Sequence, residues 1–288
     1  MPITISKNNE FAERLIANLR EQRHARRSSS SSYAINHNDD ERISVYEILP
    51  SNCLRKSYYA RKRAEPATET AETIFYYVKG IATENIITRL ANLGISQQMH
   101  EKEGIVGITD IIDNIKVIEI KDTTSGKRLD FYDNQFKGYL MHLLYYMVLT
   151  EKEKGILAIN YSNKELVWHH KDEQGYSWFY RPPNPKPAAI ESWEVHMPKD
   201  DPAREALWQQ MMRRKEQLLQ AVRTDDVTRL PRVRMRERNF KCSGCPFYDI
   251  CMNKDDETEE ALAMANDLDL LQVSGFIHHQ ISDCSHTG

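Results

Sequence analysis

The stretch IVGITDIIDNIKVIEIK, which runs from Ile105 to Lys121, constrains the fold of this chain more than any other. Two runs rich in β-branched residues, 105–112 and 116–121, flank the turn-forming pair Asp113-Asn114. Short β-branched runs separated by such a pair are typical of a β-hairpin. The sequence therefore predicts two adjacent antiparallel strands here.

The polar residues of this hairpin are placed by the alternation of side chains along a strand. Glu119 and Lys121 share one face, whereas Ile118 and Ile120 point the other way, into the core. If the loop holds an even number of residues, Asp110 lies on the same face as Glu119. Two carboxylates would then converge beside one ammonium group.

This arrangement suits the hydrolysis of a phosphodiester. Paired carboxylates bind hard divalent cations such as Mg²⁺ or Mn²⁺. A bound cation lowers the pKa of its water and neutralises charge that develops on the phosphate. A lysine can orient that water and stabilise an oxyanion. A Glu-x-Lys in a strand is more often an ion pair on a solvated face, so the motif alone leaves both interpretations open.

Hydrophobic periodicity predicts the elements around the hairpin. The helices are expected at 71–93, 133–150 and 201–224, with a shorter one after Pro50, and the strands at 155–161, 165–170, 175–180 and 190–196. Strands that alternate with helices indicate an α/β fold with a mixed central sheet flanked by helices. The metal site is expected at one edge of that sheet.

The chain divides into three parts by composition. Residues 1–42 form an N-terminal extension with one amphipathic helix and a serine-rich linker, 43–252 form the main domain, and 253–288 form an acidic tail. The formal net charge is -3, so any nucleic-acid site must be a local basic patch. We expect a cytoplasmic protein without membrane segments, because the longest apolar run, 140–149, is far shorter than the roughly 20 residues that span a bilayer.

Two residues of the helix at 133–150 strengthen the catalytic interpretation. Gln135 and Tyr139 lie four residues apart, on one helix face. Asp110, then Glu-x-Lys at 119–121, then Gln-x-x-x-Tyr, in this order and at these spacings, resemble the motifs of RecB-like nucleases of the PD-(D/E)xK superfamily. The resemblance implies a restriction-endonuclease-like core in which Asp110, Glu119, Lys121, Gln135 and Tyr139 form the catalytic site.

The metal-binding set departs from the family at one position. RecB-like enzymes carry a metal-binding histidine about four residues after a glycine in the preceding helix, and the residue that follows Gly80 at this spacing is Glu84. A glutamate can bind Mg²⁺ or Mn²⁺ but can equally be an ordinary surface residue. The expected metal-binding set is therefore Glu84, Asp110, Glu119 and Ile120.

A cysteine cluster near the C-terminus predicts a second metal site. Cys242, Cys245 and Cys251 are spaced C-x2-C-x5-C, which lets thiolates converge on one metal or cluster. Cys53 is the best candidate for a fourth ligand, ahead of Cys284 in the tail. Spacing alone leaves zinc and iron–sulfur open. One cysteine before the nuclease motifs and three after them resemble the iron–sulfur RecB-like nucleases, which implies a [4Fe–4S] cluster joining the N- and C-terminal segments.

DNA contacts are expected from two basic stretches that the cluster would bring together. Cations follow phosphates, and tyrosines stack on unpaired bases. The candidates are Arg55, Lys56, Tyr58 and Tyr59 before the core, and Arg234 and Arg236 after it. Solvated helix faces are the alternative explanation for both stretches.

The motifs together predict a metal-dependent DNA exonuclease that acts on single-stranded ends. The chain has no phosphate-binding G-x-x-x-x-G-K-[ST] motif, so it looks most like the stand-alone CRISPR-associated exonuclease family. That resemblance implies processing of DNA for spacer acquisition, with a spacer-integrase as partner. The alternatives are a repair, replication or viral nuclease of the same chemistry, and a non-catalytic DNA-binding module that kept the fold.

Overall fold

The computed structural model describes part of the chain. The described residues are 41–62, 71–91, 93–124, 129, 133–162, 168–171, 177–180, 190–233, 242, 245–252 and 259–260. The predicted helix and linker before residue 41 lie outside them, as do Arg234, Arg236 and most of the acidic tail. Within the described residues, every helix falls short of the length and apolarity that crossing a membrane requires.

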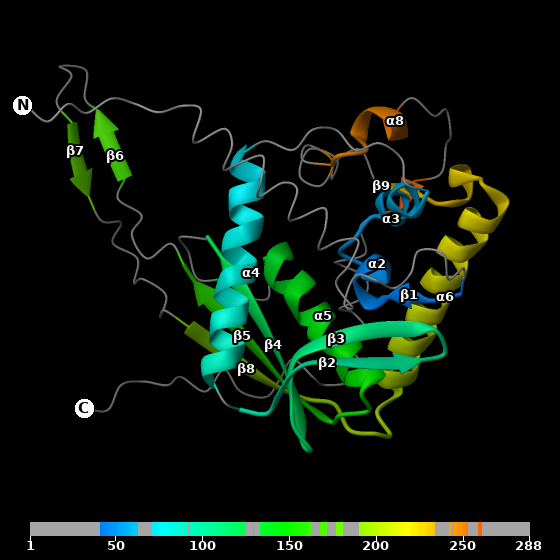
Figure 1. Cartoon of the computed structure of the whole chain (residues 1–288), viewed down its shortest axis with the longest axis horizontal. Helices are drawn as coiled ribbons and strands as arrows, with labels where there is room; N and C mark the ends of the chain where they lie inside the picture. Colours follow the sequence, from blue (N-terminus) through cyan, green and yellow to red (C-terminus); the bar gives the residue numbers. More distant parts are fainter. Residues whose placement is uncertain are drawn as a thin grey trace, which may run out of the picture.

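A mixed six-stranded sheet forms the centre of the molecule (Figure 1). Its order is β1 (Ile43–Ser44), β3 (Ile105–Ile112), β4 (Lys116–Thr123), β5 (Lys154–Tyr161) and β8 (Ile190–His196), with β2 (Ile95–Lys102) also paired to β3. The pairs β1–β3 and β4–β5 are parallel and the others are antiparallel. The expected mixed sheet flanked by helices is confirmed.

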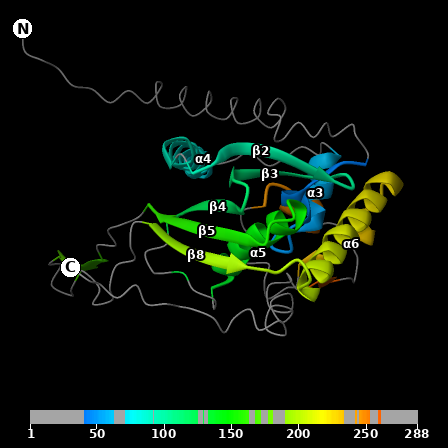
Figure 2. The ribbon, with the colours of Figure 1, turned by 90° about the horizontal axis from the view of Figure 1, so that it is seen from below.

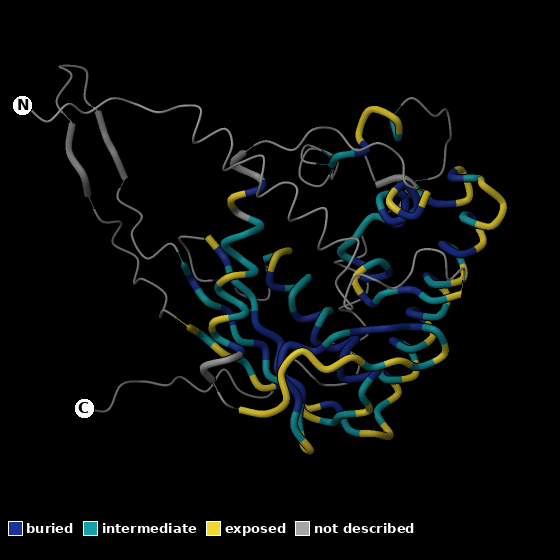
Figure 3. Tube along the Cα trace, viewed as in Figure 1, coloured by how far each residue is buried: buried dark blue, intermediate teal, exposed yellow. Residues whose placement is uncertain are grey.

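Two helices cover opposite faces of the sheet. Helix α5 (Asn134–Leu149) connects β4 to β5 and packs on the face that carries Val117 and Leu157, which belong to the larger core. Helix α4 (Ala71–Ala91) packs on the other face through Ile87, beside the buried Ile118 and Ile120. Figure 3 shows buried chain along the inner strands and α5, whereas β2 is exposed.

The β3–β4 hairpin is paired only at its closed end. Ile111 is opposite Ile118, and Ile112 is opposite Val117, after which the two strands diverge. Figure 2 shows β2 and β3 separating from β4, β5 and β8. Position 107 of β3 has to be a glycine for this path. A Cβ atom there would lie 2.6 Å from the ring of Tyr146 in α5, which is too close for two carbon atoms. The divergence opens a fork between β3 and β4, facing α5.

A helical layer packs beside the open end of the fork. It contains α2 (Val45–Ile48), α3 (Leu54–Arg61) and α6 (Pro202–Thr224). Helix α6 begins as predicted, because Asp201 caps it by accepting a hydrogen bond from the Ala203 N–H at 2.8 Å. The buried Arg214 guanidinium donates to the carbonyls of Ile48, Leu49 and Asn52, which fixes α2 and the α2–α3 loop on α6.

The remaining elements are short. They are β6 (Trp168–Lys171), β7 (Ser177–Tyr180), η1 (Val227–Arg229), β9 (Arg232–Val233), α8 (Tyr248–Met252) and β10 (Glu259–Glu260). Strands β6 and β7 pair with each other in a separate two-stranded sheet. The sequence predicted the larger helices and strands within a few residues but did not predict β2 or α2.

Candidate active site

The two predicted carboxylates lie where β3 and β4 part. Asp110 and Glu119 are both buried and lie on the α5 face of their strands, as the even loop of the hairpin requires. The Ile120 N–H donates a 2.7 Å hydrogen bond to Asp110 Oδ2. The main-chain pairing of β3 with β4 ends just before this point. The hydrogen bond from the main chain of β4 therefore holds the Asp110 carboxylate beside that strand.

Glu119 has an uneven set of partners. The Lys121 ammonium and the Nδ1 atom of His142, the latter at 2.8 Å, both contact Glu119 Oε1. The other carboxylate oxygen, Oε2, is buried and has no hydrogen-bond partner among the described residues. A buried carboxylate oxygen without a partner costs free energy, on the order of 1–3 kcal/mol or more. This oxygen is a position that a cation would satisfy.

The charges in the site are unequally distributed. Burial, followed by the charge of Glu119, raises the pKa of Asp110 well above its ordinary value. Burial also acts to raise the pKa of Glu119, but His142 and Lys121 outweigh it and lower this pKa to about 2. Without a metal ion the pair therefore holds one ionised carboxylate, Glu119, and one that retains a proton more readily, Asp110.

Lys121 is the positively charged side chain of the site. Burial lowers the pKa of Lys121, but the carboxylates of Glu119 and Asp110 outweigh burial and raise it above its ordinary value. Burial lowers the pKa of His142, so this imidazole is neutral at pH 7. The positive charge beside Glu119 is therefore that of Lys121.

Gln135 and Tyr139 line the same site from the first turns of α5. The Gln135 side-chain amide donates to the Tyr139 hydroxyl at 2.6 Å and to Thr123 Oγ1 at 3.1 Å. The Tyr139 hydroxyl in turn donates to the Asp122 carbonyl at 3.4 Å. These bonds join the helix to the end of β4 just beyond Lys121.

A cavity of about 920 Å³ opens over these residues, and α4 and α5 both contribute to its wall. Glu84 of α4 lines it and accepts a 3.3 Å hydrogen bond from Gln97. The charge of Glu84 also contributes to the raised pKa of Asp110, so Glu84 belongs to the site electrostatically. The side chain of Ile120 faces the α4 side, so only its main chain could contribute to a metal site.

Sequence reasoning missed His142 as a site residue. It interrupts the apolar run at 140–149, which on sequence grounds only argues against a membrane segment. It lies seven residues after Gln135 and three after Tyr139, so the helical period places all three on one face. That spacing is the signal that could have identified it.

Three of the predicted cysteines lie near one another: Cys53 at the start of α3, with Cys245 and Cys251 of the C-terminal segment. Cys53, Cys242, Cys245 and Cys251 are free thiols of intermediate exposure. Burial raises the pKa of Cys53, and the charges of Cys251 and Cys245 add to the effect, so these thiols are close enough to interact. The Cys245 N–H donates a hydrogen bond to the Cys242 carbonyl at 3.0 Å.

Aromatic contacts join the two cysteine-bearing segments. The rings of Tyr59 in α3 and Phe247 lie 5.8 Å apart, and the Tyr59 hydroxyl contacts the Ile250 carbonyl at 3.4 Å. Segments far apart in the sequence are thus adjacent, as the cluster prediction requires. In the described part of the chain, however, no group of three or more His, Cys, Asp or Glu side chains is already arranged to hold a metal ion.

Three predicted DNA-binding residues have interior positions. Arg55 is fully buried and donates to the Leu230 carbonyl at 2.7 Å, while Tyr58 and Tyr59 are 6% and 7% exposed. Buried side chains cannot meet a phosphate or a base without moving, so the structure favours a packing role for all three. Lys56 is half-buried near Cys245; burial raises the pKa of that thiol, and the charge of Lys56 offsets part of the rise.

Comparisons with known proteins find distant structural similarity. SSO0001, known from its crystal structure, is 19% identical, with a TM-score of 0.44 over 87% of this chain and 98% of that one. A phage-related exonuclease from Haemophilus somnus 129PT is 14% identical, with a TM-score of 0.41 over 60% and 81%. The alkaline exonuclease LHK-Exo from Laribacter hongkongensis is 9% identical, with a TM-score of 0.38 over 64% and 89%.

No protein-family model and no curated protein matches the sequence.

Proposed function

We propose that this chain is a divalent-metal-dependent deoxyribonuclease whose active site contains Asp110, Glu119 and Lys121. The observation that carries the proposal is the buried Glu119 carboxylate with one unpartnered oxygen, beside a second carboxylate and an ammonium group. A structural ion pair of this kind would be expected to saturate both oxygens, because an unpaired buried acceptor is costly. The site also borders a large cavity, so a substrate can reach it.

The donor set fits Mg²⁺ or Mn²⁺. Asp110, Glu119, the main chain of Ile120 and Glu84 of the cavity wall offer oxygen ligands, which these ions prefer. Local rearrangement is needed to load the site, because the described residues are not preassembled around a metal position. A bound ion would supply Lewis-acid activation of water and of the phosphate.

Lys121 is suited to holding the attacking water or stabilising the phosphate oxyanion, because it stays protonated beside the two carboxylates. Gln135 and Tyr139 form the hydrogen-bonded wall that positions the substrate strand. Their mutual bond and their contacts with Thr123 and Asp122 hold this wall against β4. Orientation of this kind lowers the entropic cost of reaching the transition state.

The cavity suits a single strand of DNA. Its volume of about 920 Å³ is in the range of small-ligand sites, which accommodates a few nucleotides of one strand and not a duplex. Tyr46, Tyr77 and Tyr139 line it and offer aromatic faces for unpaired bases. Among the described residues that line it, Lys121 is the one Lys or Arg, so the phosphate backbone outside the site must meet cations elsewhere.

The test is cleavage of end-labelled DNA with Mn²⁺ by the native protein, Lys121→Ala and Lys116→Ala. Lys116 begins the same strand but does not line the cavity, so it is the matched control. We expect robust cleavage of linear single-stranded DNA, lost only in Lys121→Ala, with circular single-stranded DNA left intact. Equal cleavage by both variants would refute the site, and cutting of circles would refute action at ends.

We propose further that Cys53, Cys242, Cys245 and Cys251 bind a [4Fe–4S] cluster. Support comes from the free thiols, their mutual electrostatic influence and the packing of α3 against the segment at Phe247. Four thiolates also suit zinc. Purified protein should be brown and contain iron and acid-labile sulfide, lost in Cys53→Ser and kept in Cys284→Ser. Colourless protein with stoichiometric zinc would refute the cluster.

A place in spacer acquisition is a proposal that rests on the family resemblance alone. It requires a complex with a spacer-integrase, which co-purification of the two proteins would test. For DNA outside the cavity, Lys56, Arg234 and Arg236 remain the proposed contacts, the last two outside the described residues. Absence of any complex would leave a nuclease of repair, replication or viral origin.

A further inference from the structure

Gln97 of β2 has a backbone conformation that its place in the sheet does not require. Its φ is 56°, in the left-handed region that residues other than glycine rarely adopt. The pairing of β2 with β3 omits Gln97 but keeps the same register before and after it. Gln97 therefore lies opposite a single residue of β3, Asp110, and no extra residue forms a β-bulge here. The register alone would allow an ordinary extended residue at this position.

The Gln97 side chain lies at the rim of the active-site cavity. It is exposed, lines the cavity, and donates a 3.3 Å hydrogen bond from its amide to Glu84 Oε1. Residues opposite each other on antiparallel strands are immediate neighbours, which places Gln97 beside Asp110 of the carboxylate pair. Uncommon backbone conformations cluster at functional sites. The position and the conformation of Gln97 therefore both suggest a role in the site.

The amide of Gln97 has hydrogen-bonding capacity that the protein itself does not use. A glutamine side chain carries two N–H donors and one carbonyl oxygen. One N–H donates to Glu84, and in the described part of the chain this side chain makes no second hydrogen bond. Lys121, the one Lys or Arg among the described residues that line the cavity, is paired with Glu119. A phosphate group at the rim therefore requires a neutral donor, which this amide provides.

We propose that Gln97 is a substrate-binding residue whose second N–H donates to a phosphate group next to the one that is cleaved. The left-handed backbone presents the amide at the rim, and Glu84 holds it there. This inference rests on the proposed function, because it assigns one further contact to DNA in the same cavity. The alternative is that Gln97 only shapes β2, in which case its side chain is dispensable for DNA binding.

The experiment replaces two adjacent glutamines separately, as Gln97→Gly and Gln98→Gly in the full-length protein. Gln98 is also exposed, but its φ is not positive and it lines the second cavity, so it is the matched control. Single-turnover cleavage of a short single-stranded DNA with Mn²⁺, at a series of protein concentrations, separates the half-saturating concentration from the maximal rate. Urea denaturation of the same proteins measures their stability.

We expect Gln97→Gly to be at least as stable as the native protein, because glycine adopts a positive φ without strain. Its half-saturating concentration should nevertheless rise about tenfold, with little change in the maximal rate, as for loss of one hydrogen bond to a charged group. Gln98→Gly should be less stable than the native protein, because glycine weakens an extended strand, and should bind DNA as the native protein does.

DNA strands with one neutral methylphosphonate test the phosphate contact itself. The substitution is placed in turn at each linkage that flanks the cleaved one. At one of them it should weaken binding to the native protein without weakening binding to Gln97→Gly any further. Equal losses with both proteins, or an unchanged half-saturating concentration in Gln97→Gly, would overturn the inference and leave the proposed function in place. Native protein that cleaves no DNA would overturn both.

Discussion

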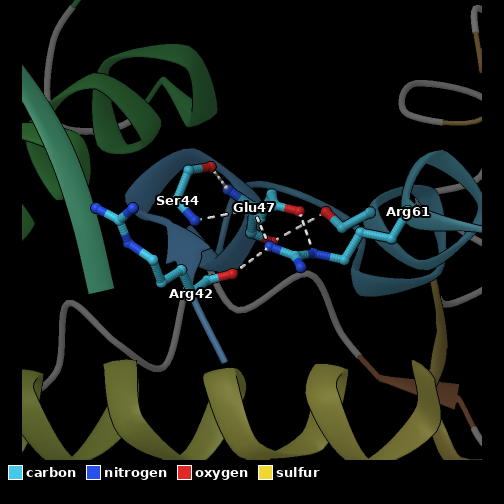
Figure 4. A network of polar contacts seen from close by, with 5 residues as sticks. Arg42, Ser44, Glu47 and Arg61 are labelled. Atoms are coloured by element: carbon cyan, nitrogen blue, oxygen red, sulfur yellow. Dashed lines mark hydrogen bonds and ion pairs between the residues drawn. The ribbon is translucent and has the colours of Figure 1, made fainter. Parts of the chain in front are cut away.

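Two glutamates in the same domain, Glu47 and Glu119, are held in opposite ways. Glu47 Oε1 accepts from Arg61 Nε at 2.6 Å, and Oε2 accepts from Arg61 Nη2 and the Ser44 N–H, each at 2.8 Å (Figure 4). Both oxygens of Glu47 are therefore satisfied. At Glu119, both donors meet one oxygen, and the other has no partner among the described residues.

This difference distinguishes a carboxylate that stabilises the fold from one that is available to bind a ligand. The Glu47–Arg61 pair is completed by the capping box of α2 and by the Arg42 carbonyl, which accepts from Arg61 at 2.8 Å. Neither carboxylate oxygen of Glu47 is left to bind a ligand. Glu119 is more deeply buried, with 1% of its surface exposed, yet it borders a cavity and keeps one oxygen unpaired. We infer that Glu47 fixes the fold and Glu119 serves the chemistry.

The largest effect is expected from Glu119→Gln. The amide removes the charge that a cation needs, so the rate of DNA cleavage should fall about a thousandfold or more, as for loss of a central electrostatic group. Single-turnover cleavage with Mn²⁺ measures this, with circular dichroism to confirm folding. Glu194→Gln, on the exposed side of β8, is the control. A fall of less than tenfold would contradict the assignment.

Breaking the structural pair should affect stability and not chemistry. Arg61→Met leaves the half-buried Glu47 without its partner, which should lower the free energy of unfolding by about 1–3 kcal/mol. Urea denaturation measures the loss. Cleavage per folded molecule should stay near the native value. A stable variant with lost activity would reverse the roles assigned to the two glutamates.

Asp110→Asn should stabilise the metal-free protein while abolishing cleavage. The raised pKa of Asp110 means that the folded state binds its proton more tightly than the unfolded state. The cost of ionising Asp110 in the folded state therefore grows as pH rises from the unfolded pKa of about 3.8 towards the higher folded pKa. Removing it should raise Tm by about 2–4 °C per kcal/mol recovered.

Thermal unfolding with a chelator present, at pH 7 and again near pH 4, tests this claim. The gain of Asp110→Asn over the native protein should shrink at the lower pH, because Asp110 is then protonated in the folded state. The neutral amide can still accept from the Ile120 N–H, so the fork should keep its geometry. A lower Tm than native at pH 7 would contradict the account.

The smallest effect is expected from Tyr139→Phe. The change removes the hydroxyl that joins Gln135 to the end of β4 but keeps the ring. Loss of about one hydrogen bond, roughly 1 kcal/mol, should slow cleavage about fivefold. Steady-state kinetics on single-stranded DNA would show it. Complete loss of activity would mean that the hydroxyl has a direct chemical role.

Local patterns were sufficient to predict the hairpin and the larger helices. The β-branched runs at 105–112 and 116–123, and the capping residue Asp201, specify structure within a few residues of themselves. Strand β2 could not be predicted, because it is polar and exposed and is held mainly by its pairing with β3. Its register depends on a partner and not on its own composition.

The site residues could be predicted where their spacing places them on one face of a strand or helix. They could not be predicted where contacts with distant parts of the chain determine whether a side chain is buried. The period of a strand and the even loop placed Asp110, Glu119 and Lys121 together. The burial of Arg55, by contrast, depends on Leu230, which is 175 residues away. The basic residues around two tyrosines therefore predicted an exposed surface. In the structure this segment is buried, because a part of the chain near its other end packs against it.

The binding of Mn²⁺ to Glu119→Gln and to Glu47→Gln, compared by calorimetry with the native protein, tests the central claim most directly. Both variants exchange one carboxylate for an amide, and both would be measured at a temperature where they remain folded. The account predicts that Glu119→Gln loses specific Mn²⁺ binding and that Glu47→Gln binds as the native protein does. Undiminished binding by Glu119→Gln would show that its unpaired oxygen does not serve a metal ion.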